Sequence, residues 1–84
     1  MIDKTYVYIV KCRDESLYTG WTKDIDSRIK VHNSGNGAKY TRSRRPVELV
    51  YWEELDGKSE ALVREAAIKK MTKKQKLILI DSFR

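Results

Sequence analysis

Two short segments rich in β-forming residues lie near the start of the chain, and turn-forming residues separate them. Residues 5–12 alternate aromatic and aliphatic side chains, so both faces of this segment are suited to at least partial burial. Turn chemistry follows at 14–16, and the β pattern resumes at 17–19. We therefore expect an antiparallel β-hairpin at the start of the fold.

One helix, one loop and one strand are predicted after the hairpin. Asp24 is suited to cap a helix of about ten residues that ends near Asn33. Glycines then interrupt the helical pattern, and residues 35–46 are expected to form a loop. The aliphatic and aromatic residues of 47–52 predict a third strand.

Two helices are predicted for the remainder. Ser59 is placed to cap a helix that runs through Met71, and Thr72 with Gln75 matches a capping box that begins a separate helix. The expected order is ββαβαα, an α+β fold in which helices flank a small three-stranded antiparallel sheet. With 84 residues, the whole chain (1–84) is expected to be a single domain.

Composition narrows the class of protein. The chain has no run of about 18 apolar residues, so we expect no membrane span. Its first residues lack the apolar stretch of a signal peptide, which predicts a cytoplasmic protein. The single cysteine, Cys12, cannot form an internal disulfide and is expected to be a buried strand thiol.

Positive charge is concentrated in two segments. Residues 39–45 carry a net charge of +4 and residues 64–76 carry +5, whereas the whole chain carries only +6. All other residues therefore sum to −3. Clustered cations repel each other without a counter-charge, so the pattern favours a nucleic-acid partner, DNA first, over a merely solvated surface. The residues predicted to contact nucleic acid are Lys39, Tyr40, Arg42, Arg44, Arg45, Lys69, Lys70, Lys73 and Lys74.

The first predicted helix carries two residues suited to chemistry. Ile25 and Ile29 are four residues apart and are expected to face the core. Arg28 and His32 have the same spacing and share the neighbouring stripe, at the edge of the sheet. Each alone is more simply explained as a surface charge or a helix-end histidine, but together, just after a tyrosine-bearing strand, they indicate a site.

Glu65 lies among small apolar residues of the second predicted helix, on the face expected to pack against the sheet. An ionised carboxylate there is costly unless a cation meets it. An ion pair with Arg64 or Lys69 is one solution. The alternative that we favour is a magnesium ion, which takes one carboxylate and borrows its other ligands from water and phosphate oxygens.

In order and spacing these segments resemble the GIY-YIG nuclease family, and in particular its small stand-alone bacterial members of the UPF0213 kind. The resemblance runs from about Lys4 to Ile80. Residues 6–8 (Tyr-Val-Tyr) resemble the first tripeptide of the family, and residues 18–20 (Tyr-Thr-Gly) resemble the second. The segments that resemble the following helix, the loop of the stand-alone members and the metal-bearing helix are 24–33, 37–41 and 59–71.

The resemblance implies hydrolysis of a nucleic-acid phosphodiester with one divalent metal ion, Mg²⁺ or Mn²⁺. By the same resemblance, Glu65 would hold the metal and Arg28 a non-bridging phosphate oxygen. Tyr18 would be the leading candidate to activate water, with Tyr8 orienting it or sharing the task. A phenol is a weak base at its ordinary pKa of about 10, so a cation or His32 must favour the phenolate. The relative roles of the two tyrosines and the histidine stay open.

The chain departs from the family pattern at three points. Tyr6 replaces the glycine of the first tripeptide, Thr19 replaces the isoleucine of the second, and no asparagine follows Glu65. The first two changes fall on strands, where we expect the backbone to tolerate them, whereas the third concerns the completeness of the site. The chain shows no added DNA-binding domain, so a protein partner would supply sequence specificity.

Two functions are consistent with these residues. The first is a metal-dependent endonuclease, structure-selective, that acts in DNA repair or recombination. The second is a nucleic-acid-binding module with a nuclease-like fold and little or no cleavage activity. A binding module needs only lysines and arginines, so the enzyme is favoured by the joint presence of Tyr8, Tyr18, Arg28, His32 and Glu65.

Overall fold

A three-stranded antiparallel sheet forms the centre of the computed structural model, which describes residues 4–83. The strands, in chain order, are β1 (Thr5–Lys11), β2 (Leu17–Thr22) and β3 (Glu48–Leu55). In space they are ordered β2-β1-β3, so that β1 is paired on both sides. Within β1, Tyr8 lies opposite Gly20 of one neighbour and Trp52 of the other. The predicted hairpin and third strand are confirmed.

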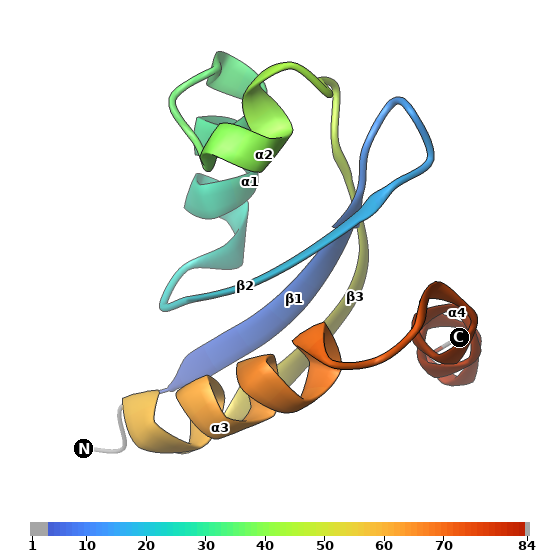
Figure 1. Cartoon of the computed structure of the whole chain (residues 1–84). Coiled ribbons are helices and arrows are strands. Elements are labelled where there is room, and N and C mark those ends of the chain that lie inside the picture. The colour runs from blue at the N-terminus through green and yellow to red at the C-terminus, as the bar shows by residue number, and fades with distance from the viewer. Residues whose placement is uncertain (1–3, 84) are drawn as a thin grey trace.

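Helices cover both faces of this sheet (Figure 1). The helices formed by residues 4–83 are α1 (Ile25–Ser34), α2 (Lys39–Arg42), α3 (Lys58–Lys69) and α4 (Lys73–Ser82). Figure 1 shows α1 and α2 together on one side of the sheet and α3 on the other. The predicted α+β class is confirmed. No helix in this described range is long and apolar enough to cross a bilayer.

Alternate side chains of β1 build two small cores. On the α3 side, Val7 and Ile9 pack with Ala61 and Ile68, and all four are fully buried. Each large aliphatic side chain buried in this way stabilises the fold by about 1.5–3 kcal/mol. The core on the α1 side is made of Tyr8, Val10, Cys12 and Val47, with Ile29 packed against it. Cys12 is a buried thiol as predicted, but it lies directly after β1, which ends at Lys11, and not within the strand.

The caps predicted from sequence are present at two helices. The side chain of Asp24 accepts a hydrogen bond from the backbone N–H of Ser27, which fixes the start of α1. Thr72 and Gln75 form both hydrogen bonds of a capping box, at 3.2 and 2.9 Å, so α4 begins as a separate helix.

The structure differs from the prediction at four points. The segment predicted as a loop contains α2, a single helical turn that the surrounding glycines and proline conceal in the sequence. β3 continues to Leu55 because Glu53, within its added length, is held by Arg64 of α3 at 2.9 Å. Gly57, not Ser59, is the N-cap residue of α3. This helix also ends at Lys69, before the predicted Met71.

Replacing Thr72 by alanine removes the side-chain half of the α4 capping box. We expect the variant to lose about 1 kcal/mol of unfolding free energy, since the amide of Gln75 then has no cap. Urea unfolding followed by circular dichroism measures this loss. Thr72→Ser keeps the hydroxyl and should remain close to wild type. Equal unfolding midpoints for all three proteins would contradict the assigned cap.

Candidate active site

The hydroxyl of Tyr8 is the centre of a buried polar cluster between the sheet and α1. His32 Nε2 lies 2.7 Å from the Tyr8 oxygen, and Arg28 Nε donates a hydrogen bond to the same oxygen at 3.4 Å. The exposed fractions of Tyr8 and His32 are 1% and 0%. A hydrogen bond lost at this burial is costly, so these bonds position the Tyr8 and His32 side chains.

Two glycines leave the space that this cluster occupies. A Cβ atom at Gly20 would lie 2.6 Å from the Tyr8 hydroxyl, and a Cβ atom at Gly37 would lie 2.6 Å from His32 Nδ1. Neither distance is sterically possible for an alanine without movement. Gly20 is the last residue of the predicted Tyr-Thr-Gly tripeptide. Because this glycine has no side chain, the Tyr8 ring can lie across the neighbouring strand β2.

The second nitrogen of the imidazole is bound by a residue of α2. His32 Nδ1 lies 2.9 Å from Thr41 Oγ1, and Thr41 donates its hydroxyl proton to the carbonyl oxygen of Ala38 at 3.0 Å. Thr41 is fully buried. The sequence gives Thr41 no signal beyond its place in the 37–41 motif, so its contact with His32 is new from the structure.

One arrangement of protons satisfies every group in this cluster. A guanidinium only donates hydrogen bonds, and a carbonyl oxygen only accepts them. Arg28 therefore donates to Tyr8, and Tyr8 donates to His32 Nε2. His32 Nδ1–H in turn donates to Thr41, which donates to Ala38. This directed chain places the proton of the neutral imidazole on Nδ1 and leaves Nε2 to accept the proton of Tyr8.

The pKa directions agree with a neutral resting pair. Burial lowers the pKa of His32 below 6.5, and the positive charge of Arg28 lowers it further. Burial raises the pKa of the Tyr8 phenol, although its hydrogen bond from Arg28 acts in the opposite direction. Tyr18 and Glu65 add smaller electrostatic contributions that raise the pKa of Tyr8. Glu65 belongs to α3, which covers the opposite face of the sheet from α1 (Figure 1).

Glu65 is largely buried and already neutralised by a cation. Its side chain is 16% exposed, and one carboxylate oxygen lies 3.5 Å from Lys69 Nζ. The ion pair with Lys69 that the sequence offered as an alternative is thus present, whereas Arg64 binds Glu53 instead. Burial and the positive charge of Lys69 lower the pKa of Lys76 in α4.

The donor set suits a weakly held, hard cation. Among residues 4–83, no three His, Cys, Asp or Glu side chains gather into a metal site. Glu65 therefore offers a single carboxylate, which pairs with Lys69. This fits magnesium or manganese with mostly water and phosphate ligands, and it does not fit an ion coordinated by protein alone.

Tyr18 lies at the rim of the cluster. Its ring centroid is 5.5 Å from that of His32, and the Tyr40 ring stacks on its other side at 5.8 Å. Arg44 covers the outer face of Tyr40 at 3.9 Å. Within the described part of the chain, the Tyr18 hydroxyl makes no hydrogen bond. The structure therefore brings four of the predicted catalytic residues together. Glu65 lies on α3 and pairs with Lys69, and among residues 4–83 no hydrogen bond or ion pair joins it to these four.

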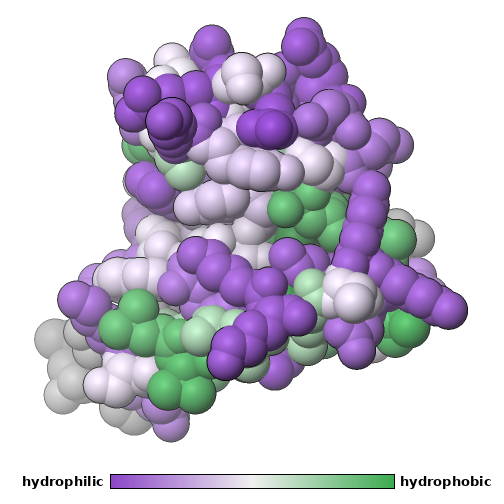
Figure 2. All heavy atoms as spheres, viewed as in Figure 1, coloured by the Kyte–Doolittle hydropathy of each residue, from purple (hydrophilic) through white to green (hydrophobic). Residues whose placement is uncertain are grey.

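The residues predicted to contact nucleic acid divide into two kinds. Most are exposed, namely Lys39, Tyr40, Arg42, Arg45, Lys69, Lys70, Lys73 and Lys74. Arg44 is instead engaged within the protein, because it pairs with Asp14 at 3.0 Å and donates to the Tyr40 carbonyl at 2.8 Å. Figure 2 shows hydrophilic side chains gathered over the part of the molecule that α1 and α2 form.

Comparison with known proteins identifies close relatives along almost the whole chain. Residues 4–77 match the family model of the GIY-YIG catalytic domain. A UPF0213 protein of Clostridium perfringens is 64% identical over 77 residues, which cover 92% of this chain and 83% of the relative. A UPF0213 protein of Staphylococcus saprophyticus is 62% identical over 80 residues, which cover 95% and 98%.

Two solution NMR structures have the same fold. One is a protein of E. faecalis, 44% identical, with a TM-score of 0.65 over 99% of this chain and 91% of that chain. The other is a UPF0213 protein of Bacillus halodurans, 46% identical, with a TM-score of 0.60 over 93% and 83%. The resemblance predicted from the two tripeptides is confirmed.

The proton arrangement can be tested directly because His32 is the only histidine in the chain. Long-range ¹H–¹⁵N spectra at neutral pH should show one imidazole with a protonated Nδ1 and an unprotonated Nε2. Thr41→Val removes the acceptor of Nδ1–H and should shift this equilibrium towards the other tautomer. Thr41→Ser should restore the wild-type spectrum. A protonated Nε2 in the wild type would contradict the directed chain.

The lowered pKa of His32 predicts that stability falls on mild acidification. Between the folded pKa and the ordinary value of 6.5, the unfolded chain binds more protons than the folded chain. The contribution of His32 is therefore complete above pH about 6.5 and is lost as the pH falls through that window. The carboxyls with lowered pKa, Asp14 and Glu53, have ordinary values of 3.8 and 4.5 and titrate below it.

Urea unfolding between about pH 7.5 and about pH 5.5 measures this effect. We expect the unfolding midpoint of the wild type to decrease across this range. A His32→Gln variant lacks the titrating group and should show a nearly flat profile over the same range. A midpoint that stays constant or rises in the wild type would show that the imidazole is not held neutral by the fold.

Proposed function

The chain belongs to the GIY-YIG family of nuclease domains, and from that premise we propose that it is an endonuclease that hydrolyses phosphodiester bonds in DNA with a divalent metal ion. It acts selectively on DNA structures that arise in repair or recombination, and a protein partner supplies any sequence specificity. The observation that carries the proposal is the directed chain of hydrogen bonds from Arg28 through Tyr8 to His32.

Tyr8 is the group best supported as the relay for the proton of water. As the water oxygen bonds to phosphorus, its proton passes to the Tyr8 oxygen and the proton of Tyr8 passes to His32 Nε2. The bond from phosphorus to the leaving oxygen breaks, and that oxygen takes a proton from solvent. The imidazolium then returns its proton to the Tyr8 oxygen, and the proton that Tyr8 took from water passes to solvent. The sequence favours Tyr18 for this task, but only Tyr8 has a hydrogen-bonded acceptor for its proton.

Arg28 and Tyr18 are suited to hold the reacting phosphate. Arg28 uses Nε for Tyr8, which leaves the terminal amino groups of its guanidinium to bind a non-bridging phosphate oxygen. Tyr18 lies beside His32 with its hydroxyl uncommitted to residues 4–83, so it is available to position water or phosphate. Tyr8 and His32 are both neutral at rest. The proton of Tyr8 therefore moves to His32 only when bound substrate and water supply another proton to the Tyr8 oxygen.

Glu65 is the residue that would bind the metal ion. Nucleases of this family generally use divalent metal ions. Bound there, such an ion would neutralise charge on the phosphate and would replace the negative influence of Glu65 on the Tyr8 phenol by a positive one, which lowers the pKa of Tyr8. Lys69 must release the carboxylate for this exchange.

The second candidate is a nucleic-acid-binding module that does not cut. It is favoured by the ion pair between Glu65 and Lys69, which leaves the carboxylate already neutralised. The exposed lysines and arginines of the two basic segments are sufficient for binding. The two candidates differ in one measurable respect, the dependence of strand cleavage on metal ions and on Glu65.

Glu65→Gln should abolish cleavage while leaving the fold intact. We expect wild type to nick supercoiled plasmid and branched DNA with Mg²⁺ or Mn²⁺ and not with EDTA. Loss of a residue that supports a metal ligand commonly reduces activity by about 10–100-fold, so loss of the carboxylate itself should reduce it by at least about a hundredfold. Gel assays of initial nicking rates measure this loss.

Glu60→Gln is the matched control for that experiment. Glu60 is an exposed acid on the same helix, and glutamine can still accept its hydrogen bond from the backbone of Asp56. This variant should cut like wild type. Cleavage that survives in Glu65→Gln would refute the assigned metal residue. DNA binding without cleavage in every preparation would support the binding module.

A further inference from the structure

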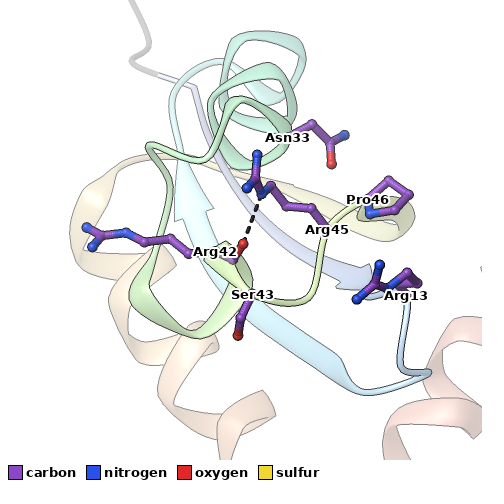
Figure 3. A pocket seen from close by; sticks show the side chains of 6 residues that line it. All are labelled: Arg13, Asn33, Arg42, Ser43, Arg45 and Pro46. Carbon is purple, nitrogen blue, oxygen red and sulfur yellow. Dashed lines mark hydrogen bonds between the residues drawn. The ribbon is translucent and has the colours of Figure 1, made fainter.

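A second group of basic side chains lines a pocket outside the Tyr8–His32 cluster. Figure 3 shows its three arginines, Arg13 from the β1–β2 turn, Arg42 from the end of α2, and Arg45 from the segment before β3. The pocket has a volume of about 440 Å³. Its other lining residues are Asn33, Ser43 and Pro46, so no carboxylate lines it. None of these six residues belongs to the predicted catalytic set.

Hydrogen bonds within the protein hold the walls of this pocket. The side chain of Asn33 binds the backbone of Val47 twice, donating at 3.1 Å and accepting at 2.7 Å. The backbone N–H of Arg13 donates to the carbonyl of Arg44 at 2.9 Å. The acid next in sequence to Arg13, Asp14, is paired with Arg44. The frame is therefore preformed, and that carboxylate is already committed elsewhere.

The three arginines contribute differently. Arg45 Nε donates to the Arg42 carbonyl at 2.9 Å, which fixes the Arg45 side chain across the pocket. In Figure 3 the guanidinium of Arg42 points away from those of Arg13 and Arg45. Arg42 thus contributes its main-chain carbonyl, which holds the Arg45 side chain, whereas Arg13 and Arg45 supply the positive charge. Arg13 is exposed and makes no side-chain ion pair with any residue from 4 to 83.

We propose that this pocket binds a backbone phosphate of the DNA at a position away from the reacting phosphate. The inference rests on the proposed function for its ligand class. Guanidinium groups offer donors only, in a fork that matches phosphate oxygens. No acid lines the pocket to balance the positive charge of Arg13 and Arg45. A phosphate would supply that negative charge.

The position of the pocket indicates what a second bound phosphate would do. Arg42 follows Thr41 directly, and Thr41 holds His32 Nδ1 on the inner side of α2. One helical turn therefore separates the pocket from the catalytic cluster. A phosphate bound at Arg13 and Arg45 fixes the register of the strand relative to Arg28 and Tyr8, which is the task of backbone contacts in nucleic-acid recognition.

The test measures DNA binding and needs no cleavage. Fluorescence anisotropy of a labelled duplex, in EDTA, gives the dissociation constant of the full chain across a range of salt concentrations. Each phosphate contact contributes about 0.9 to the slope of log affinity against log salt. Arg13→Ala should weaken binding several-fold and reduce that slope by about 0.9. Arg13→Lys keeps the charge and should restore most of the slope.

Lys58→Ala is the matched control, because it removes one exposed positive charge at the start of α3, which lies on the opposite side of the sheet from α1 and α2 (Figure 1). It should leave the slope unchanged. Arg45→Ala should act in the same direction as Arg13→Ala, and the His32 spectrum confirms that each variant keeps the cluster intact. Slopes for Arg13→Ala and Arg45→Ala equal to that of Lys58→Ala would overturn the phosphate site.

The outcomes separate this inference from the proposed function. If wild type binds and cuts DNA but Arg13→Ala binds like the control, the pocket fails and the nuclease stands. If wild type binds without cutting and Arg13→Ala reduces the slope, the pocket stands and hydrolysis fails. A wild type that binds no DNA at all overturns both.

Discussion

The rest of the site depends on the buried hydrogen bond between Tyr8 and His32. It joins the central strand to α1, and the opposite nitrogen of the same imidazole joins α1 to α2 through Thr41. A neutral histidine with both nitrogens satisfied inside the protein is stable only in one tautomer. The fold thus determines more than where these side chains lie. It determines which atom receives a proton when the Tyr8 phenol loses one.

Space around this bond is controlled by residues without side chains. Gly20 lies opposite Tyr8 in the sheet, and a Cβ atom there would collide with the hydroxyl. Gly37 has the same relation to the His32 ring. The two departures from the family tripeptides, Tyr6 and Thr19, leave the strands intact, because these positions do not have to make room for the Tyr8 phenol. This explains why the chain keeps its tyrosines and the Gly20 glycine while departing from the family pattern beside them.

The sequence predicts the elements well where local chemistry decides them. Periodicity and caps place α1 and α4, since Asp24, Thr72 and Gln75 act on backbone groups within three residues. It predicts the members of the site through spacing and resemblance, but not their order. The choice of Tyr8 over Tyr18 as the proton donor to His32 rests on contacts between separate elements, and no sequence pattern encodes the direction of a hydrogen bond. The sequence does not predict the one-turn helix that carries Thr41 for the same reason, because the stability of that helix comes from packing.

The charge pattern of the sequence is likewise limited as a guide to which residues lie together in the fold. Four basic residues within 39–45 suggest four contacts with nucleic acid, yet Arg44 is committed to Asp14 and Tyr40. Arg45 instead shares a pocket with Arg13, which lies more than thirty residues earlier in the chain. A cluster along the sequence therefore differs from a cluster in space, and only a cluster in space can present several cations to one ligand. The same reasoning applies to Glu65, whose place on an apolar helix face suggests a site, although the structure pairs its carboxylate with Lys69.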